Sequence, residues 1–303
     1  MKVQLMPDEL LSFSLAGLTS WGIGGKAHRF YRPVDALALM NYIKLLPPQT
    51  PLVWLGLGSN VLIRDGGIQG AVICTRSLQK LTQPEPGRII AEAGVTCAKL
   101  ARFGCKAGAN EAAFFAGIPG TVGGALAMNA GAFGGETWEW VENVTVMNAQ
   151  GECFTRSPQD YDISYRTVKG KQACQSQEAF MSAVFRFPIG NEKIGMEKIQ
   201  ALLRTRKQTQ PIGTLNCGSV YRNPPGEFAA KLIEACALKG HRIGNAFISP
   251  KHANFIINGG GATSRDIEAL MATIENCVLT KFGISLHPEV RILGQRSEEQ
   301  WEI

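Results

Sequence analysis

The sequence predicts an α+β protein with two domains, one over residues 1–190 and one over residues 191–303. Its 303 residues are enough for two domains of about 150 residues each. Apolar residues make up 45% and charged residues 18%, a composition that is typical of globular chains and excludes disorder. Short β-rich runs bounded by glycine or aspartate come first, and a more helical, more basic part begins near residue 193.

The N-terminal domain is predicted to be rich in short strands. A helix is expected over 34–46, with Val34, Leu37, Ile43 and Leu46 available for burial. A second helix is expected over 96–106, with Thr96 as its N-cap. Strands are expected at 27–32, 51–56, 60–65, 70–75, 88–92 and 180–187, and a hairpin joins 139–148 to 152–155.

The C-terminal domain is predicted to hold three helices, at 193–207, near 228–238 and at 264–282. The last is the clearest, because Thr263 and Asp266 suit a capping box and Gly283 suits the position after the helix. Its predicted apolar face comprises Ile267, Leu270, Met271, Ile274, Val278 and Phe282. Strands are expected at 254–257 and 287–294.

The positive charge of the chain is local. The formal net charge is +6, but residues 186–251 hold eleven Lys and Arg against four Glu, so this window carries +7 and the remainder −1. A nucleic-acid surface would interleave basic residues with stacking aromatics, and the window has four aromatic residues. We therefore expect no nucleic-acid partner, and expect the window to meet phosphates of small molecules.

The cysteines and the apolar runs of the sequence indicate where in the cell the protein is expected. Eight cysteines are scattered without a CxxC pair, and the four histidines lack metal-ligand spacing, so we expect reduced thiols and no metal. The N-terminus lacks the apolar core of a signal peptide. The longest uncharged run, 112–135, is rich in glycine and unsuited to a membrane helix. The expectation is a cytoplasmic protein without a membrane partner.

Glycine is in excess, at 34 residues or about 11%, and three segments could bind phosphate. Residues 22–27 resemble the end of a P-loop, but Ser20 and Ala27 replace its first glycine and its Ser/Thr. Residues 56–61 follow a strand, but Val61 replaces the third Rossmann glycine and leads into a strand. That loop is either a phosphate-binding nest or a plain turn. The third segment, 114–135, either packs on a flat ring or is a buried loop.

Six blocks of sequence carry a specific resemblance. They are GLGSNVLIRD (56–65), AGIPGTVGGALAMNAGAFGGE (116–136), SYR (164–166), NCGSVYRNP (216–224), KHANFIIN (251–258) and HPEVRILG (287–294). The glycine loops resemble the FAD-binding half of the vanillyl-alcohol-oxidase-type flavoproteins, which has no Rossmann fold. All six, in order over about residues 18–294, resemble the UDP-N-acetylenolpyruvoylglucosamine reductase family.

This resemblance implies a vanillyl-alcohol-oxidase-type FAD-binding domain of two α+β subdomains, followed by a C-terminal α+β substrate-binding domain. FAD would be bound non-covalently, since no histidine lies in the glycine loops to form a covalent link. The implied cofactor-binding residues are Gly56, Gly58, Ser59, Asn60, Val61, Leu62, Gly117, Ile118, Pro119, Gly120, Thr121, Gly123, Gly124, Ala125, Asn129 and Gly131.

The same resemblance implies an NADPH-dependent reductase of peptidoglycan synthesis. FAD would pass hydride from NADPH to C3 of the enolpyruvyl group of a UDP-sugar, which leaves negative charge on C2 and its carboxylate. Arg166 matches the family's charge-stabilising arginine, Ser219 its proton donor and Glu289 its active-site glutamate. The alternatives are a surface arginine, a turn serine and a strand carboxylate that pairs with Arg291.

Four further residues are implied on the substrate side: Tyr165, Arg222, Asn223 and Lys251. Arg222 departs from the lysine of many relatives but keeps the charge. Arg204, Arg206 and Lys207 could meet diphosphate or form a solvated helix face.

The length fits the family's shorter form without a substrate-capping tyrosine loop, and we expect a monomer. The competing function in the same class is an oxidase that passes electrons to oxygen.

Overall fold

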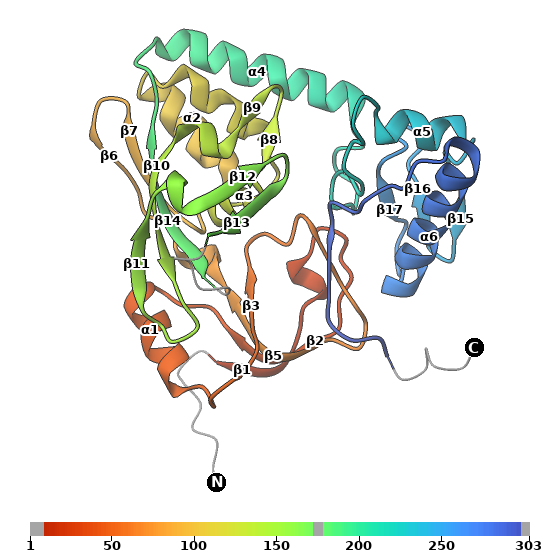
Figure 1. Ribbon diagram of the computed structural model, residues 1–303, viewed down its shortest axis with the longest axis horizontal. Coiled ribbons are helices and arrows are strands. Elements are labelled where there is room, and N and C mark those ends of the chain that lie inside the picture. The colour runs from red at the N-terminus through yellow and green to blue at the C-terminus, as the bar shows by residue number, and fades with distance from the viewer. Residues whose placement is uncertain (1–8, 172–177, 298–303) are drawn as a thin grey trace. The chain divides into compact units, whose positions relative to one another are not determined.

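The computed structural model describes residues 9–171 and 178–297 (Figure 1). The chain forms two compact units that alternate along the sequence. Unit 1 takes in the described residues of Met1–Leu10, Phe30–Gly56 and Ala71–Thr205, and unit 2 those of Leu11–Arg29, Leu57–Gly70 and Arg206–Ile303. Strands and helices are mixed in both units, so the α+β class is confirmed. The predicted boundary at residue 190 between an FAD-binding domain and a substrate-binding domain stays a prediction.

Unit 1 is built on an antiparallel five-stranded sheet with the order β11-β10-β14-β7-β6. The central strand β14 pairs Ala183 with Val144 of β10 and with Ala91 of β7. The predicted strands and the 139–155 hairpin are confirmed, and β6 was not predicted. The strands are β6 (Leu81–Glu85), β7 (Arg88–Glu92), β10 (Val141–Met147), β11 (Cys153–Arg156) and β14 (Ala179–Arg186).

Two helices and a long 3-10 segment share the core of this sheet. They are α2 (Cys97–Lys106), α3 (Val122–Met128) and η3 (Asn110–Gly117). The predicted cap of α2 is confirmed, because the Thr96 side chain accepts a hydrogen bond from the Lys99 amide. Leu100, Phe115 and Phe185 are fully buried in one cluster. Helix α3 was missed because its sequence, VGGALAM, has two glycines and no strong apolar period.

A second sheet has the order β1-β2-β5-β3, and the unit boundaries fall within β2 and β5. Its strands are β1 (Leu10–Ser14), β2 (Lys26–Tyr31), β3 (Leu52–Leu55) and β5 (Ile68–Cys74), of which β1 was not predicted. Helix α1 (Ala36–Leu45) buries Leu39, Tyr42 and Ile43. The predicted burial of Val34 and Leu37 is wrong: both are about two-thirds exposed, because Val34 precedes the helix and Leu37 points away from its buried face.

Unit 2 packs two helices with small sheets around a second core. Helix α6 (Ser264–Phe282) has the predicted bounds, the Thr263–Asp266 capping box and the left-handed Gly283. Five of its six predicted core residues are buried, but Phe282 is 38% exposed, because the cluster ends on this helix at Val278. The other elements are α5 (Ala229–Ala235), β4 (Val61–Ile63), β15 (Arg242–Ile243), β16 (Ala246–Ile248), β17 (Ile256–Asn258) and β18 (Arg291–Leu293).

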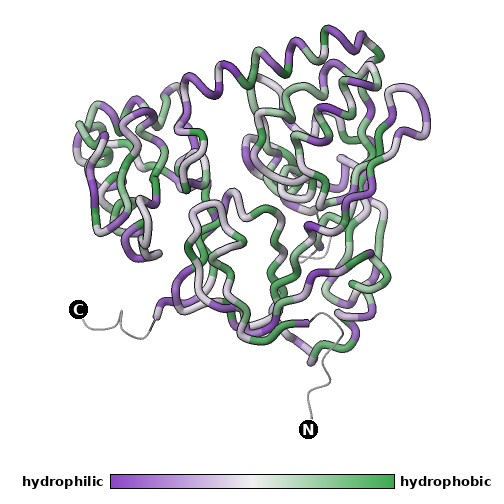
Figure 2. Tube along the Cα trace, turned by 180° about the vertical axis from the view of Figure 1, so that it is seen from behind, coloured by the Kyte–Doolittle hydropathy of each residue, from purple (hydrophilic) through white to green (hydrophobic). Residues whose placement is uncertain are grey.

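Helix α4 (Glu192–Thr209) confirms the predicted basic helix and crosses the unit boundary at residue 205. Only Gly195 and Ile199 of it are buried, and Figure 2 shows long hydrophilic stretches along it. None of the helices in the described part of the chain is long and apolar enough to cross a membrane. The seven cysteines of that part are free thiols, and Cys174 lies outside the described residues.

Candidate active site

Arg166 lies at the tip of a hairpin in unit 1. Strands β12 (Tyr161–Ser164) and β13 (Thr167–Gly170) are antiparallel, and Ser164 faces Thr167, so Tyr165 and Arg166 form a two-residue loop. The φ of Arg166 is +54°, a left-handed conformation that costs a non-glycine residue roughly 1–2 kcal/mol. Such strain is concentrated at functional sites, where the surroundings hold it in place.

The Arg166 guanidinium is held by the glycine-rich loop. Its Nη2 donates to the Gly131 carbonyl at 2.9 Å and its Nη1 to the Asn129 carbonyl at 3.3 Å. The guanidinium also lies 4.9 Å from the ring centre of Tyr165, which is 44% exposed. Two backbone carbonyls and one ring therefore direct this cation, and a freely moving surface arginine is excluded.

Asn129 joins the loop to the hairpin. It is buried, and its Nδ2 donates to the Ser164 carbonyl at 3.3 Å and to Glu136 at 2.7 Å. Its Oδ1 accepts the Trp138 amide at 3.1 Å. The side chain is thus committed to the protein, and any contact of Asn129 with a cofactor would involve its main chain.

The glycines of residues 117–135 have two different surroundings. A Cβ added at Gly117 would lie 2.7 Å from the Cβ of Ala132, and one at Gly123 would lie 2.9 Å from that of Ala93. These two glycines allow protein to pack on protein, as the buried-loop alternative requires. Gly124 is different: it is exposed, and an added Cβ would meet only the Thr121 hydroxyl, at 3.8 Å.

The first turn of α3 is not an open phosphate site. The amides of Val122 and Gly123 donate to the carbonyls of Val95 and Ala93, and Gly124 donates to the Thr121 hydroxyl. Ile118 and Ala125 are buried, whereas Pro119 is exposed. Their predicted contacts with FAD stay predictions.

The Gly-Ser-Asn loop of unit 2 offers free donors. Gly58 is buried with φ +66°, and a Cβ there would overlap the Leu18 carbonyl oxygen, so only glycine fits. Among the described residues, neither the Gly58 amide nor the Ser59 amide donates a hydrogen bond. Consecutive unused amides around a left-handed residue form a nest for an anion. The loop therefore fits the diphosphate of FAD better than a plain turn.

Asn60 ties this loop to Glu289. Its Nδ2 donates to the Glu289 carbonyl at 3.0 Å, and its own carbonyl accepts the Arg291 amide at 3.0 Å. The following strand β4 pairs in parallel with β18, with Val61 opposite Arg291. The Leu62 side chain is in the core, so only its main chain could reach a cofactor.

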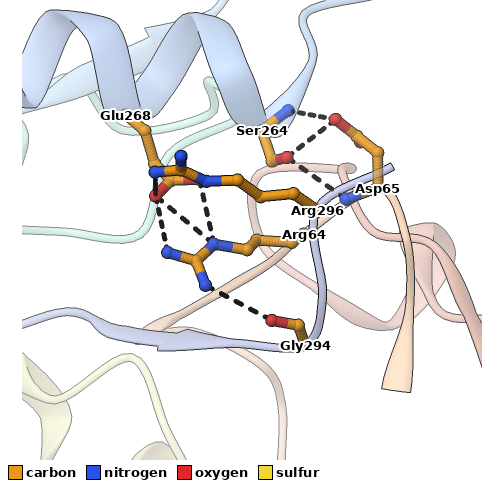
Figure 3. A network of polar contacts seen from close by, with 6 residues as sticks. All are labelled: Arg64, Asp65, Ser264, Glu268, Gly294 and Arg296. Atoms are coloured by element: carbon orange, nitrogen blue, oxygen red, sulfur yellow. Dashed lines mark hydrogen bonds and ion pairs between the residues drawn. The ribbon is translucent and has the colours of Figure 1, made fainter. Parts of the chain in front are cut away.

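A polar network anchors the end of β4 in unit 2 (Figure 3). Arg64 donates to both carboxylate oxygens of Glu268 on α6, with the shortest contact at 2.8 Å, and the bond raises the pKa of Arg64. Asp65 accepts the Ser264 hydroxyl at 2.7 Å and its amide at 2.9 Å. Arg296 lies 3.6 Å from Glu268. These bonds fix β4, and with it the loop that precedes it.

Unit 2 also brings Ser219 beside Glu289. The chain from Val220 to Arg222 is extended and pairs with the chain from His287, with Tyr221 opposite Pro288. The Glu289 amide donates to the Val220 carbonyl at 2.7 Å, and the Arg222 amide donates to the His287 carbonyl at 3.0 Å. Two predicted catalytic residues, far apart in the sequence, therefore lie on neighbouring segments.

Three buried or partly buried titratable groups of this region, Cys217, Tyr221 and His252, are neutral at neutral pH. Burial raises the pKa of the Cys217 thiol well above its ordinary value, and the nearby Glu289 charge adds to this. Burial also raises the pKa of Tyr221, whose hydroxyl contacts the Met271 carbonyl and Glu275. Burial lowers the pKa of His252. At neutral pH none of the three adds a charge beside Ser219.

The predicted substrate-side residues have protein partners as well. The Asn223 side chain accepts the Ala229 amide at the start of α5, at 3.1 Å. The Lys251 ammonium, on an exposed residue, donates to the Lys207 carbonyl at 2.6 Å. Arg222 is partly buried. A functional role for these residues stays a prediction.

One residue of this region was missed by the sequence interpretation. Asn254 is buried and bonds through its side chain to the main chain of Tyr221. A lone asparagine before the apolar run Phe255–Ile257 was the available signal, since a polar group at a buried position must have partners.

Comparisons with known proteins agree over the whole length. A family model described as an FAD binding domain matches residues 27–157, and one described as the C-terminal domain of UDP-N-acetylenolpyruvoylglucosamine reductase matches residues 210–293. The UDP-N-acetylenolpyruvoylglucosamine reductase of Methylococcus capsulatus is 51% identical over 282 residues, which cover 93% of this chain and 91% of that protein. That of Coxiella burnetii is 50% identical over 301 residues, covering 93% and 94%.

A solved structure has the same fold. The crystal structure of UDP-N-acetylenolpyruvylglucosamine reductase (MurB) from Thermus caldophilus matches with a TM-score of 0.79 at 28% identity. The match covers 94% of this chain and 98% of that chain. Both units are therefore included in the similarity.

Proposed function

Because the chain belongs to the UDP-N-acetylenolpyruvoylglucosamine reductase family, we propose that Arg166, Ser219 and Glu289 carry its chemical step. The protein is an FAD-dependent oxidoreductase that uses NADPH to reduce UDP-N-acetylenolpyruvoylglucosamine to UDP-N-acetylmuramate in peptidoglycan synthesis. When bound, FAD supplies the transfer of hydride from NADPH to C3 of the enolpyruvyl group.

The three residues divide the remaining work. Hydride addition at C3 leaves an electron pair on C2, shared with the carboxylate, and the Ser219 hydroxyl gives its proton to C2 and later regains one from solvent. The Arg166 guanidinium stabilises the carboxylate charge, and a planar, permanently charged donor suits that group. Glu289 helps to position or polarise the substrate carboxylate.

The pairing of the Ser219 and Glu289 segments is the observation that carries this proposal. The Glu289 amide and the Val220 carbonyl are joined by a 2.7 Å hydrogen bond, which keeps the two segments side by side. Neighbouring Cys217 is buried and neutral, so no nearby thiolate competes for the proton. A weak acid such as serine can protonate only a strongly basic carbon held close to it, and a fixed segment meets that requirement.

Two segments, each described within its own unit, are proposed to bind the cofactor. Gly58 and Ser59 offer unused amides to the diphosphate, and the exposed Gly124 leaves room for a ring. The substrates are small molecules. We further propose that the protein works as a monomer in the cytoplasm, without nucleic-acid or membrane partners.

Ser219→Ala tests the assignment. In anaerobic stopped-flow, reduction of the flavin by NADPH should stay within about twofold, and reoxidation by the enolpyruvyl substrate should slow by ~10²–10⁴-fold, the usual contribution of a general acid. Ser285→Ala, an exposed loop serine of the same unit, is the control and should change neither rate. Equal losses in both half-reactions would remove Ser219 from the role of proton donor.

The oxidase alternative is tested in the same apparatus. Reduced enzyme that reacts with oxygen much faster than with the enolpyruvyl substrate would favour an oxidase. Protein that is colourless and cannot be reconstituted with FAD would overturn the proposed function altogether.

A further inference from the structure

The segment that carries Ser219 is held from its other side by one buried asparagine. Asn254 is 4% exposed, and its side chain accepts the Tyr221 amide at 2.9 Å and donates to the Tyr221 carbonyl at 2.8 Å. Its main-chain carbonyl accepts the Val220 amide, also at 2.9 Å. Three hydrogen bonds thus join one residue to the two residues that follow Ser219.

From this geometry we propose that Asn254 is a positioning residue that sets the place of the Ser219 hydroxyl. The proposal rests on the proposed role of Ser219 as proton donor. Asn254 does not itself donate a proton to the substrate; it acts through the main chain of Val220 and Tyr221.

The primary carboxamide of Asn254 takes the place of a neighbouring strand. It presents one donor and one acceptor to the two main-chain groups of Tyr221, as a paired strand residue would. Strand β17 begins only at Ile256, so no regular ladder reaches this point. On the opposite side Val220 and Arg222 bond to Glu289 and His287. The segment is therefore bonded along both edges.

The turn that carries Asn254 is itself rigid. Ser249 is fully buried, and its hydroxyl accepts the amides of Lys251 and His252 at 3.1 and 3.3 Å. His252 in turn accepts the Asn254 amide on Nδ1 at 3.3 Å. The main chain of Asn254 has little freedom, so its carboxamide can transmit a fixed position to Tyr221.

The hydrogen bonds of the Ser219 segment before the serine are local. Gly218 has φ +82°, and its amide is held by the Asn216 side chain at 2.9 Å in a local turn. An added Cβ at Gly218 would meet nothing within 4 Å. The bonds at Val220 and Tyr221 are thus the hydrogen bonds nearest to Ser219 that come from the body of unit 2. Losing two of them would let the serine drift relative to the acceptor carbon, and proton transfer is sensitive to such shifts.

Asn254→Ala removes the two side-chain bonds. Reoxidation of reduced enzyme by the enolpyruvyl substrate should slow by ~10–100-fold, less than in Ser219→Ala, and reduction by NADPH should stay within about twofold. Hydrogen exchange of the Tyr221 amide should speed up in the enzyme without substrate. A larger solvent deuterium isotope effect on reoxidation is also expected, because proton transfer becomes slower.

Asn258→Ala is the matched control. Asn258 lies in the same unit, is 6% exposed and makes three side-chain bonds, to the Trp21 carbonyl and to the Gly260 and Ala262 amides. This variant should lose comparable stability and leave both half-reactions and the isotope effect within about twofold. If Asn258→Ala slows reoxidation as much as Asn254→Ala does, the effect is general softening and the proposal fails.

A double variant separates this proposal from the proposed function. If Asn254 acts through Ser219, then Ser219→Ala with Asn254→Ala should reoxidise no slower than Ser219→Ala alone, within about twofold. Multiplied losses would overturn the proposal and leave the proton donor in place. A Ser219→Ala enzyme with normal reoxidation would overturn both.

Asn254→Asp covers the case in which the alanine variant does not fold. Aspartate keeps the size and still accepts the Tyr221 amide, but cannot donate to the Tyr221 carbonyl. Slower reoxidation with unchanged reduction by NADPH supports the proposal, and two unchanged rates overturn it.

Discussion

The predicted catalytic residues of the two units are held in different ways. In unit 1, Arg166 lies at a strained two-residue turn, and its side chain bonds to the glycine-rich loop through the Asn129 and Gly131 carbonyls. In unit 2, Ser219 and Glu289 lie on adjacent segments that bond main chain to main chain. The difference follows from side-chain length. The long arginine side chain is held in one position only if hydrogen-bond acceptors contact its guanidinium. The serine side chain has one χ angle, so the position of its hydroxyl is set mainly by its backbone.

The difference indicates where each half is vulnerable. The position of the Arg166 guanidinium depends on two main-chain carbonyl oxygens, which residues of any type could supply. It also depends on a left-handed turn conformation, which few residue types tolerate. The serine and glutamate depend on partners in the sequence blocks 251–258 and 287–294. Substitutions far from Ser219 in the sequence should therefore slow the proton transfer.

Replacement of Arg166 should give the largest effect in unit 1. Lysine keeps the charge but cannot donate to two carbonyls in the fork geometry, so Arg166→Lys should slow reoxidation by ~10²-fold or more. Stopped-flow reoxidation measures this. If the lysine variant is within tenfold of the wild-type rate, charge alone suffices and the carbonyl-directed geometry is unimportant.

The backbone strain at Arg166 can be measured separately from the loss of its guanidinium. Arg166→Gly and Arg166→Ala lose the same guanidinium, but glycine adopts φ +54° without a steric cost. The glycine variant should be more stable by about 1 kcal/mol in urea unfolding. Equal stabilities would mean that the turn relaxes and stores no strain.

Asn60→Ala should have a smaller effect, because Glu289 keeps its main-chain bond to Val220. Loss of one bond to the Glu289 carbonyl should lower the free energy of unfolding by about 1 kcal/mol and slow reoxidation several-fold at saturating FAD. Asn245→Ala, which loses a weak bond to the Gly261 carbonyl, is the control. Reduced FAD affinity with normal reoxidation would show that Asn60 serves the cofactor alone.

His252→Asn, whose amide oxygen can accept the Asn254 amide in place of Nδ1, should have the smallest effect, confined to mildly acidic pH. Burial lowers the pKa of His252 below its ordinary 6.5, Lys239 adds to this and Glu234 opposes it. Its stabilising effect is complete above pH 6.5 and declines as the pH falls through the lower folded pKa. Between pH 7 and pH 5 the wild type should therefore lose more unfolding free energy than the variant. Equal slopes in urea titrations would contradict this.

Local signals in the sequence predicted local structure well. The Thr263–Asp266 capping box and Gly283 defined α6 to the residue, and Thr96 marked the start of α2. The helix α3 escaped because two glycines lower its helix propensity, and one of them, Gly123, serves close packing, which has no periodicity. The burial of Leu37 was misjudged because the face that a helix buries is set by its partner.

The sequence by itself determined the family and the α+β class and predicted which residue types carry the chemistry, because ordered motifs and helix caps are written in contiguous residues. Only the tertiary structure decided that Ser219 lies beside Glu289, that Asn60 bonds to Glu289, and that Asn254 holds Tyr221. The physical reason is that a hydrogen bond between distant residues needs only one donor and one acceptor. It leaves no spacing or period in the sequence, so the partner becomes known only when the chain has folded.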